Sequence, residues 1–139
     1  MDEDIYKRLC RAREFMDDSF GLPLTLDQIS REACISPYHF HRLFRQTFEQ
    51  TPHQYLTARR IRRAKELLES NPIAVTDVCF EVGFQSLGSF ITLFRKHVGH
   101  SPRTYRRIFI VRQPLSRIPA CFIFMFTGQG TSLESVSDS

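Results

Sequence analysis

Two stretches of this chain, fifty residues apart, carry the same pattern of apolar and turn-forming residues. Residues 36–55 read SPYHFHRLFRQTFEQTPHQY, and residues 86–105 read SLGSFITLFRKHVGHSPRTY. Upstream of these stretches the shift is forty-nine, so that residues 29, 33 and 35 align with residues 78, 82 and 84. An internal repeat of this kind indicates that the chain folds as two copies of one small unit. The matched positions include Phe40 with Phe90, Leu43-Phe44-Arg45 with Leu93-Phe94-Arg95, Pro52 with Pro102, and Tyr55 with Tyr105.

Each copy is predicted to form two short helices joined by a tight turn. Thr25 can cap the first helix of the first copy, and Gln28 stands three residues on as its capping-box partner. Ser36-Pro37 restarts the chain as a helix, with serine at the N-cap and proline at the first helical position. In the second copy the turn falls at Gly83-Phe84, where glycine suits a left-handed backbone. Two short helices and a short turn make a helix-turn-helix.

A long helix over residues 52–69 is predicted between the copies. Thr51 is its N-cap, and the helix stops before Asn71-Pro72, because the residue before a proline avoids the helical conformation. At about 1.5 Å per residue this helix is roughly 27 Å long. An amphipathic helix over residues 4–18 precedes the first copy, and a last short helix runs from Ser101-Pro102 to about Arg107.

The pattern changes beyond this last helix. Residues 108–111 and 121–126 are apolar runs that favour two short strands or buried extended segments, and residues 127–139 are expected to be disordered. The sequence thus predicts an all-α fold of about seven helices, with two helix-turn-helix subdomains joined by a long linker helix and a short C-terminal extended or β-like tail. The expected bounds are 4–50 for the first unit, 52–69 for the linker, 74–108 for the second unit and 109–139 for the extension, with 4–108 forming one domain.

Charge points to the kind of partner. The formal net charge is +4, and sixteen of the nineteen basic residues are arginine, with the surplus in residues 35–112. Arginine is favoured for contacts with phosphates and base edges, so this surplus fits an anionic partner, although a solvated basic face fits it equally well. No apolar run is long enough to span a bilayer, and the acidic start lacks the basic region of a signal peptide. We therefore expect a cytoplasmic protein without membrane contact.

The remaining reactive residues suggest neither a cofactor nor catalysis. Cys34 and Cys79 fall in apolar helical patterns and are expected to be buried thiols. The spacing of Cys34, His39, His41 and His53 matches no standard zinc pattern, so we expect no metal and no cofactor. No catalytic triad or phosphate-cradling glycine loop is evident, and we predict that the chain is not an enzyme.

The pattern VCFEVGF at residues 78–84, followed by Phe90, Phe94-Arg95, Gly99 to Pro102 and Tyr105-Arg106, resembles the DNA-binding domain of the AraC/XylS family of bacterial transcription regulators. The resemblance covers about residues 4–108. It implies two helix-turn-helix units rigidly joined by a long helix, with double-stranded DNA as the partner and transcription control as the role. Recognition helices at about 37–48 and 87–98 would enter successive major grooves, which lie about 34 Å apart. Activation, with contact to RNA polymerase, is the commoner family role, and it would place the protein at the bacterial nucleoid.

The resemblance also implies which residues contact bases. In the first unit Tyr38, His41 and Arg42 occupy the base-facing positions, and arginine can form two hydrogen bonds with one guanine. The corresponding residues of the second unit are Leu87, Gly88, Ser89 and Thr92, where relatives often carry longer polar side chains. Leu87 can meet a thymine methyl group, and Ser89 or Thr92 can reach a base or a phosphate. The first unit is therefore expected to supply most of the sequence discrimination.

Phosphate contacts are expected from exposed basic and polar side chains near the two recognition helices. Each candidate has a plain alternative as a surface charge, a helix cap or a structural ion pair. The candidates are Arg45, Gln46, Arg59, Gln85, Ser86, Arg95, Lys96, Arg103 and Arg106.

The alternative to a sequence-specific regulator is a protein-interaction module that has the same fold and binds DNA weakly or without specificity. The weakly polar second recognition helix is the reason to keep it open. We expect a stand-alone, monomeric binder, because only three residues precede the first predicted helix. The phenylalanine-rich tail is expected either to pack on the helices or to mediate self-association.

Overall fold

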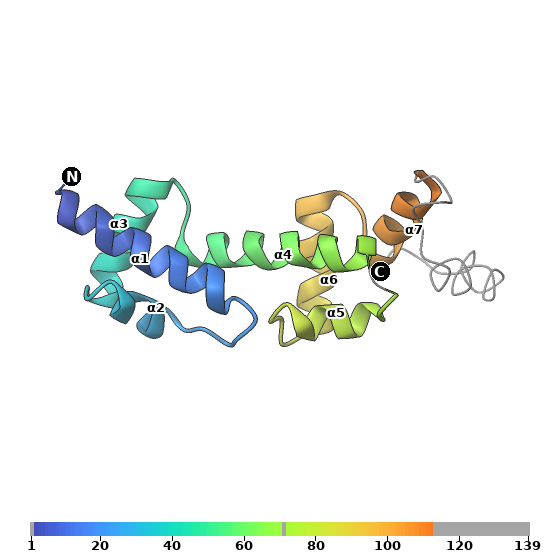
Figure 1. Ribbon diagram of the computed structural model, residues 1–139, viewed down its shortest axis with the longest axis horizontal. Coiled ribbons are helices and arrows are strands. Elements are labelled where there is room, and N and C mark those ends of the chain that lie inside the picture. The colour runs from blue at the N-terminus through green and yellow to red at the C-terminus, as the bar shows by residue number, and fades with distance from the viewer. Residues whose placement is uncertain (1, 71, 113–139) are drawn as a thin grey trace. The chain divides into compact units, whose positions relative to one another are not determined.

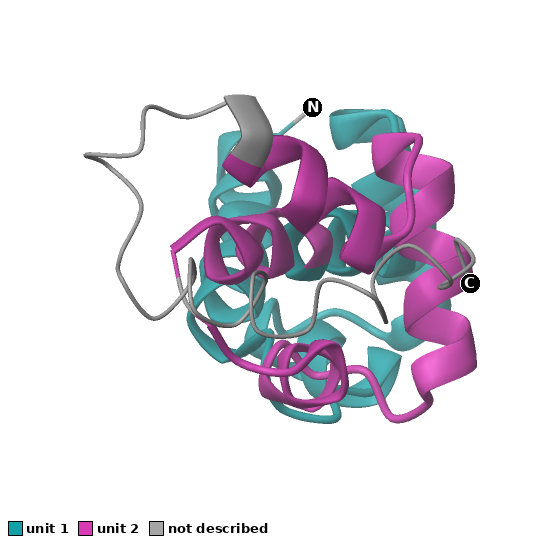
Figure 2. Cartoon of the chain, turned by 90° about the vertical axis from the view of Figure 1, so that its right-hand side faces the viewer, with its two compact units in different colours: residues 1–60 teal, residues 61–139 magenta. Residues whose placement is uncertain are grey.

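The computed structural model describes residues 2–70 and 72–112, and within them the chain forms seven α-helices and no strand (Figure 1). These residues divide into two compact units, unit 1 within residues 1–60 and unit 2 within residues 61–139 (Figure 2). The predicted all-α fold is confirmed. The helices are α1 (Glu3–Ser19), α2 (Leu26–Glu32), α3 (Pro37–Phe48), α4 (Pro52–Ser70), α5 (Val75–Glu81), α6 (Leu87–Val98) and α7 (Pro102–Arg112).

Unit 1 is built from α1, α2, α3 and the first part of α4. Phe40 and Phe44 lie one turn apart on α3, are fully buried, and place their ring centroids 5.5 Å apart. This spacing puts both rings on one face of the helix, so the opposite face of α3 is left to solvent. The buried cluster around them consists of Leu9, Ala12 and Met16 from α1, with Ile29, Ala33 and Leu56.

Unit 2 repeats this arrangement with the second part of α4, α5, α6 and α7. Phe90 and Phe94 take the places of Phe40 and Phe44 on α6, are fully buried, and have ring centroids 5.7 Å apart. Helix α4 therefore serves both units, as the closing helix of unit 1 and the opening helix of unit 2. The other buried side chains of unit 2 include Ile61, Ala64, Leu67, Leu68, Val78, Cys79, Val82 and Phe84.

The turns between the paired helices also repeat. Cys34 has φ 56° and Gly83 has φ 101°, both in the left-handed region that glycine adopts most easily. The backbone hydrogen bonds match as well, since Ile35 N–H donates to Ser30 O over 3.3 Å and Phe84 N–H donates to Cys79 O over 3.1 Å. Cys34 is exposed at this turn, so its prediction as a buried thiol is wrong, whereas Cys79 is buried as predicted.

Two of the predicted helix starts are confirmed in detail. Thr25 and Gln28 form a complete capping box at α2, with hydrogen bonds of 2.9 and 3.2 Å. Thr51 and Gln54 form the same pair at α4, with hydrogen bonds of 2.9 and 3.1 Å. Ser36 stands at the N-cap of α3, but its side chain makes no capping hydrogen bond. Serine at the N-cap and proline at the first helical position are therefore confirmed, and the missing hydrogen bond leaves Pro37 as the residue that favours the start of this helix.

The C-terminal end of the described chain corrects a second prediction. Residues 108–111, expected to be extended, belong to α7, which continues to Arg112. Tyr105 and Phe109 stand one helical turn apart, and their rings stack with centroids 6.4 Å apart. A short apolar run cannot be assigned to strand or helix by periodicity alone, which explains the error. The predictions for residues 121–126 and 127–139 lie outside the described residues.

None of the helices in residues 2–70 and 72–112 has the length and apolar character needed to cross a membrane.

Candidate nucleic-acid interface

Helix α3 presents a polar face on the side opposite its buried phenylalanines. Tyr38 is 80% exposed, and Arg42, Arg45 and Gln46 are also exposed. Residues 38, 42 and 45 follow one another at intervals of four and three, so they lie along one face of the helix. An aromatic ring followed by two guanidinium groups can contact bases and phosphates in a major groove. The structure thus brings Tyr38 and Arg42 together on one exposed surface.

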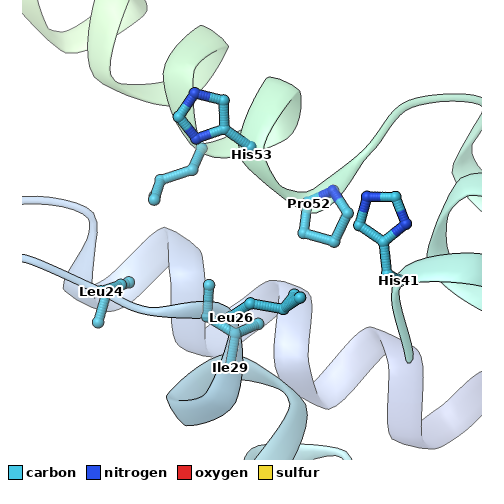
Figure 3. Close-up of a pocket in the computed structure, with 7 residues that line it drawn as sticks. Leu24, Leu26, Ile29, His41, Pro52 and His53 are labelled. Carbon is cyan, nitrogen blue, oxygen red and sulfur yellow. The ribbon is translucent and has the colours of Figure 1, made fainter. Parts of the chain in front are cut away.

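His41 occupies the edge of this face. It is half-buried and lines a small hollow of about 140 Å³ between α2, α3 and the start of α4 (Figure 3). The floor of the hollow is apolar, and His53 at the start of α4 is exposed on its rim. His41 is therefore less accessible than Tyr38 or Arg42, and its imidazole faces a pocket that the sequence pattern did not predict. The other lining residues are Leu24, Leu26, Ile29, Pro52 and Leu56.

Helix α6 presents a smaller and less polar face. Leu87 is 36% exposed, and Gly88, Ser89 and Thr92 are exposed. A Cβ atom added at Gly88 would meet only the Ser86 hydroxyl oxygen, at 3.8 Å, so there is room for a side chain at this position. The weak polarity of this face therefore comes from the residues present and not from crowding.

Ser86 caps α6 in the way that the sequence allowed. Its hydroxyl oxygen accepts a hydrogen bond from Ser89 N–H over 3.3 Å. One of its two lone pairs is thus engaged, and its hydroxyl proton remains available to an acceptor such as phosphate.

Six of the other phosphate candidates lie where a ligand can reach them. Their side chains are long and polar, and Arg95 and Lys96 stand in the last turn of α6. The exposed candidates are Arg45, Gln46, Gln85, Arg95, Lys96 and Arg103.

Arg59 does not fit the role of a phosphate contact. Its side chain is 21% exposed, its Nε lies 3.8 Å from the Asp17 carboxylate, and its guanidinium lies 4.5 Å above the Phe20 ring. Its Nε and Nη1 atoms are buried without a hydrogen-bond partner among the described residues. Arg59 therefore packs against the end of α1. Its neighbour Arg60 does the same, since it donates to the carbonyl oxygens of Phe20 and Leu22 over 2.8 and 2.9 Å.

The prediction for Arg106 is wrong for a similar reason. Arg106 is 5% exposed, and its Nε donates to the carbonyl oxygen of Leu68 over 3.3 Å. Burial lowers the pKa of its guanidinium to about 10. Arg106 stands in one basic run with Arg103 and Arg107, which are both exposed. The residue type therefore does not indicate which arginine is buried, and the position of each around the helix decides it.

The described residues contain no group of three or more histidine, cysteine, aspartate or glutamate side chains that could hold a metal ion.

Comparison with known proteins identifies the family of this chain. A family model described as a helix-turn-helix domain matches residues 29–108, and the solved structures that share the fold include AraC-type DNA-binding domains. The chain belongs to the AraC/XylS family. It is a helix-turn-helix DNA-binding domain of the type found in transcription regulators.

Two solved structures match most of the chain. One is the DNA-binding domain of AdpA in complex with a target DNA, with a TM-score of 0.73 and 27% identity over 77% of this chain and 96% of that one. The other is an AraC-type transcriptional regulator from Chromobacterium violaceum, with a TM-score of 0.70 and 28% identity over 78% of this chain and 96% of that one.

The curated relatives that match are longer than this chain. The transcriptional activator RhaS of Escherichia coli O139:H28 is 30% identical over 105 residues, which are 76% of this chain and 38% of RhaS. The bifunctional transcriptional activator and DNA repair enzyme AdaA of Bacillus subtilis is 34% identical over 95 residues, 68% of this chain and 45% of AdaA. The chain thus spans less than half the length of these relatives. Because AdaA is also a repair enzyme, the absence of enzymatic activity in this chain stays a prediction.

Proposed function

We propose that this protein is a sequence-specific transcription activator that inserts α3 and α6 into successive major grooves of one DNA duplex. In this proposal α3 reads most of the bases, and α6 mainly positions the protein on the DNA. The observation that carries it is the contrast between the two helices. Tyr38 and Arg42 are exposed on α3, whereas the matching face of α6 holds Leu87, Gly88, Ser89 and Thr92.

The chemistry of these side chains supports different roles for α3 and α6. A guanidinium can donate two hydrogen bonds to guanine O6 and N7, and a good bidentate contact of this kind discriminates by about 1–3 kcal/mol. Leu87 can touch a thymine methyl group but cannot form such a pair. Ser89 and Thr92 have hydroxyl groups that suit either a base edge or a phosphate. His41 is a third base contact on α3 if its ring turns from the hollow toward the groove.

The length of α4 supports the two-groove arrangement. Its nineteen residues make a helix of about 28 Å, and successive major grooves on one side of a duplex are about 34 Å apart. One chain then reads an asymmetric site without a partner, so we propose that it binds as a monomer.

Backbone contacts supply the general affinity in this proposal. The exposed candidates near α3 are Arg45 and Gln46, and those near α6 are Gln85, Ser86, Arg95, Lys96 and Arg103. Such contacts carry no sequence information and weaken as salt rises. RhaS and AdaA are activators by name. We therefore propose activation at bacterial promoters, with contact to RNA polymerase.

The test is selection of bound duplexes from a random DNA pool with the full chain at two salt concentrations. The proposal predicts one asymmetric motif that spans about two helical turns, with the stronger preferences in one half. Steep salt dependence without any enriched motif would mean that the chain binds the backbone alone. No binding at low salt would favour the alternative, a protein-interaction module, for which the weakly polar face of α6 is the supporting observation.

A further inference from the structure

Each unit carries a tyrosine that joins the recognition helix to the helix that opens the unit. In unit 1 the ring of Tyr55 packs edge-on against Phe44, with centroids 5.9 Å apart and an interplanar angle of 77°. In unit 2 the ring of Tyr105 packs against Phe94 in the same way, at 5.7 Å and 72°. Both phenylalanines are fully buried on α3 and α6. The rings are thus equivalent contacts on the inner faces of the two recognition helices.

The hydroxyl groups of these tyrosines repeat as well. Tyr55 donates to Asp17 Oδ1 on α1 over 2.7 Å, and Tyr105 donates to Glu69 Oε2 on α4. Asp17 lies 38 residues before its tyrosine and Glu69 lies 36 residues before its own, and the two acids differ in type. The same contact is therefore made in both units although the sequence positions of the acids do not repeat.

Both carboxylates stand at the end of a helix where negative charge is disfavoured. Asp17 is two residues from the end of α1 and Glu69 is one residue from the end of α4, and neither helix has a basic residue in its last turn. A carboxylate at the C-terminus of a helix interacts unfavourably with the helix dipole. A hydrogen bond from the tyrosine hydroxyl offsets this, because bonds to a charged acceptor are stronger than neutral ones. Burial and Glu69 together raise the pKa of Tyr105, which keeps its hydroxyl a donor.

We propose that Tyr55 and Tyr105 are positioning residues that fix α3 and α6 against the opening helix of each unit, and that the hydroxyl–carboxylate bond sets the orientation from which bases are read. The ring holds the inner face of the recognition helix, and the hydroxyl anchors that ring to α1 or α4. Loss of the hydroxyl leaves the packing in place and releases the anchor. This inference rests on the proposed reading of bases by the two helices.

The test compares Tyr55→Phe and Tyr105→Phe in the full chain, on the selected duplex and on all of its single-base-pair variants. Tyr55→Phe should reduce discrimination about three- to tenfold at the base pairs that Arg42 reads. Loss of a hydrogen bond to a charged acceptor changes an equilibrium constant by at least about this factor. Tyr105→Phe should reduce discrimination only in the other half of the site. Affinity for unrelated duplexes should stay within about twofold for both variants, because backbone contacts are unchanged.

Matched variants of Asp17 separate the hydrogen bond from the charge. Asp17→Asn and Asp17→Ala both remove the ion pair with Arg59, but the asparagine oxygen can still accept from Tyr55. We expect Asp17→Asn to retain discrimination and Asp17→Ala to match Tyr55→Phe. The double variant with Asp17→Ala and Tyr55→Phe should lose no more discrimination than either single variant, because both changes remove the same hydrogen bond.

Two outcomes would overturn the proposal. One is a Tyr55→Phe protein that unfolds more easily yet keeps its full discrimination profile, which would make the hydroxyl merely structural. The other is an equal loss across both halves of the site. Amide hydrogen exchange without DNA provides a readout that does not depend on base reading: Tyr55→Phe should speed exchange in α3 and leave α6 unchanged. If the native chain selects no motif, the proposed function fails, and this exchange pattern alone decides whether the tyrosines position the helices.

Discussion

Arg42 is the residue on which the base-reading account depends most. It is exposed on α3, one helical turn after the 80%-exposed Tyr38. We expect Arg42→Ala to cost about 1–3 kcal/mol of binding free energy on the preferred duplex and to relax specificity at one base pair. Binding titrations against a panel of single-base-pair variants measure both effects.

Two arginines serve as controls for this change. Arg11→Ala removes an equal charge from an exposed position on α1 and should leave the specificity profile unaltered. Arg103 is a proposed phosphate contact. Arg103→Ala should therefore weaken binding to all duplexes equally and lower the slope of log binding constant against log salt concentration by about one. If Arg42→Ala behaves like Arg103→Ala, Arg42 contacts only the backbone.

Arg106 is buried, and we expect that it makes no phosphate contact. Its guanidinium is buried, so replacing it with an apolar side chain of similar length removes a desolvated charge without removing a DNA contact. The change removes the donor to the Leu68 carbonyl oxygen, which lowers stability but does not alter the DNA contacts. We expect Arg106→Met to retain affinity within about twofold and to keep the native salt slope, as measured by titration at several salt concentrations. A reduced slope would return Arg106 to the interface.

The helix caps allow a prediction at the scale of elements. Thr25 accepts from Gln28 N–H at the start of α2, whereas Ser36 makes no capping hydrogen bond at the start of α3. Thr25→Ala should therefore lower the free energy of unfolding by about 1 kcal/mol. Ser36→Ala should change it by less than about 0.5 kcal/mol, as for an ordinary surface position. Denaturant titration of the two variants decides this, and equal losses would contradict the assigned capping pattern.

At this scale the sequence predicted most of the helices, because repeated apolar spacing and capping residues are local signals. The capping boxes of Thr25 and Thr51 are examples, since their partners stand three residues away. Errors arose where tertiary packing decides the outcome. Residues 108–111 belong to α7, where the rings of Tyr105 and Phe109 stack one helical turn apart. Ser36 stands at the N-cap of α3 as predicted, yet its side chain makes no capping hydrogen bond.

The candidate site was predicted less completely than the fold, for a related reason. Exposure of Tyr38 and Arg42 follows from the buried stripe of Phe40 and Phe44, which fixes the outer face of α3. Whether a given arginine faces solvent depends on residues far along the chain. Arg59 lies against Asp17 and Phe20, and Arg106 lies against Leu68. These contacts span 38 or more residues and leave no local signature.

At the scale of the whole molecule, the repeat explains how one chain obtains two recognition helices. Helix α4 closes unit 1 and opens unit 2, so a single continuous element belongs to both. The positive net charge of +4 is consistent with an anionic partner. The account therefore predicts one chain bound to one asymmetric duplex site, without the two-fold symmetry that a dimer of identical chains imposes on its target.

Hydroxyl-radical footprinting of the full chain on the selected duplex, at a measured ratio of protein to DNA, tests this claim most directly. The account predicts two protected stretches about one helical turn apart, about 10 base pairs, at one chain per duplex. A single protected stretch, or two stretches that appear only with two chains bound, would contradict the reading of both grooves by one molecule.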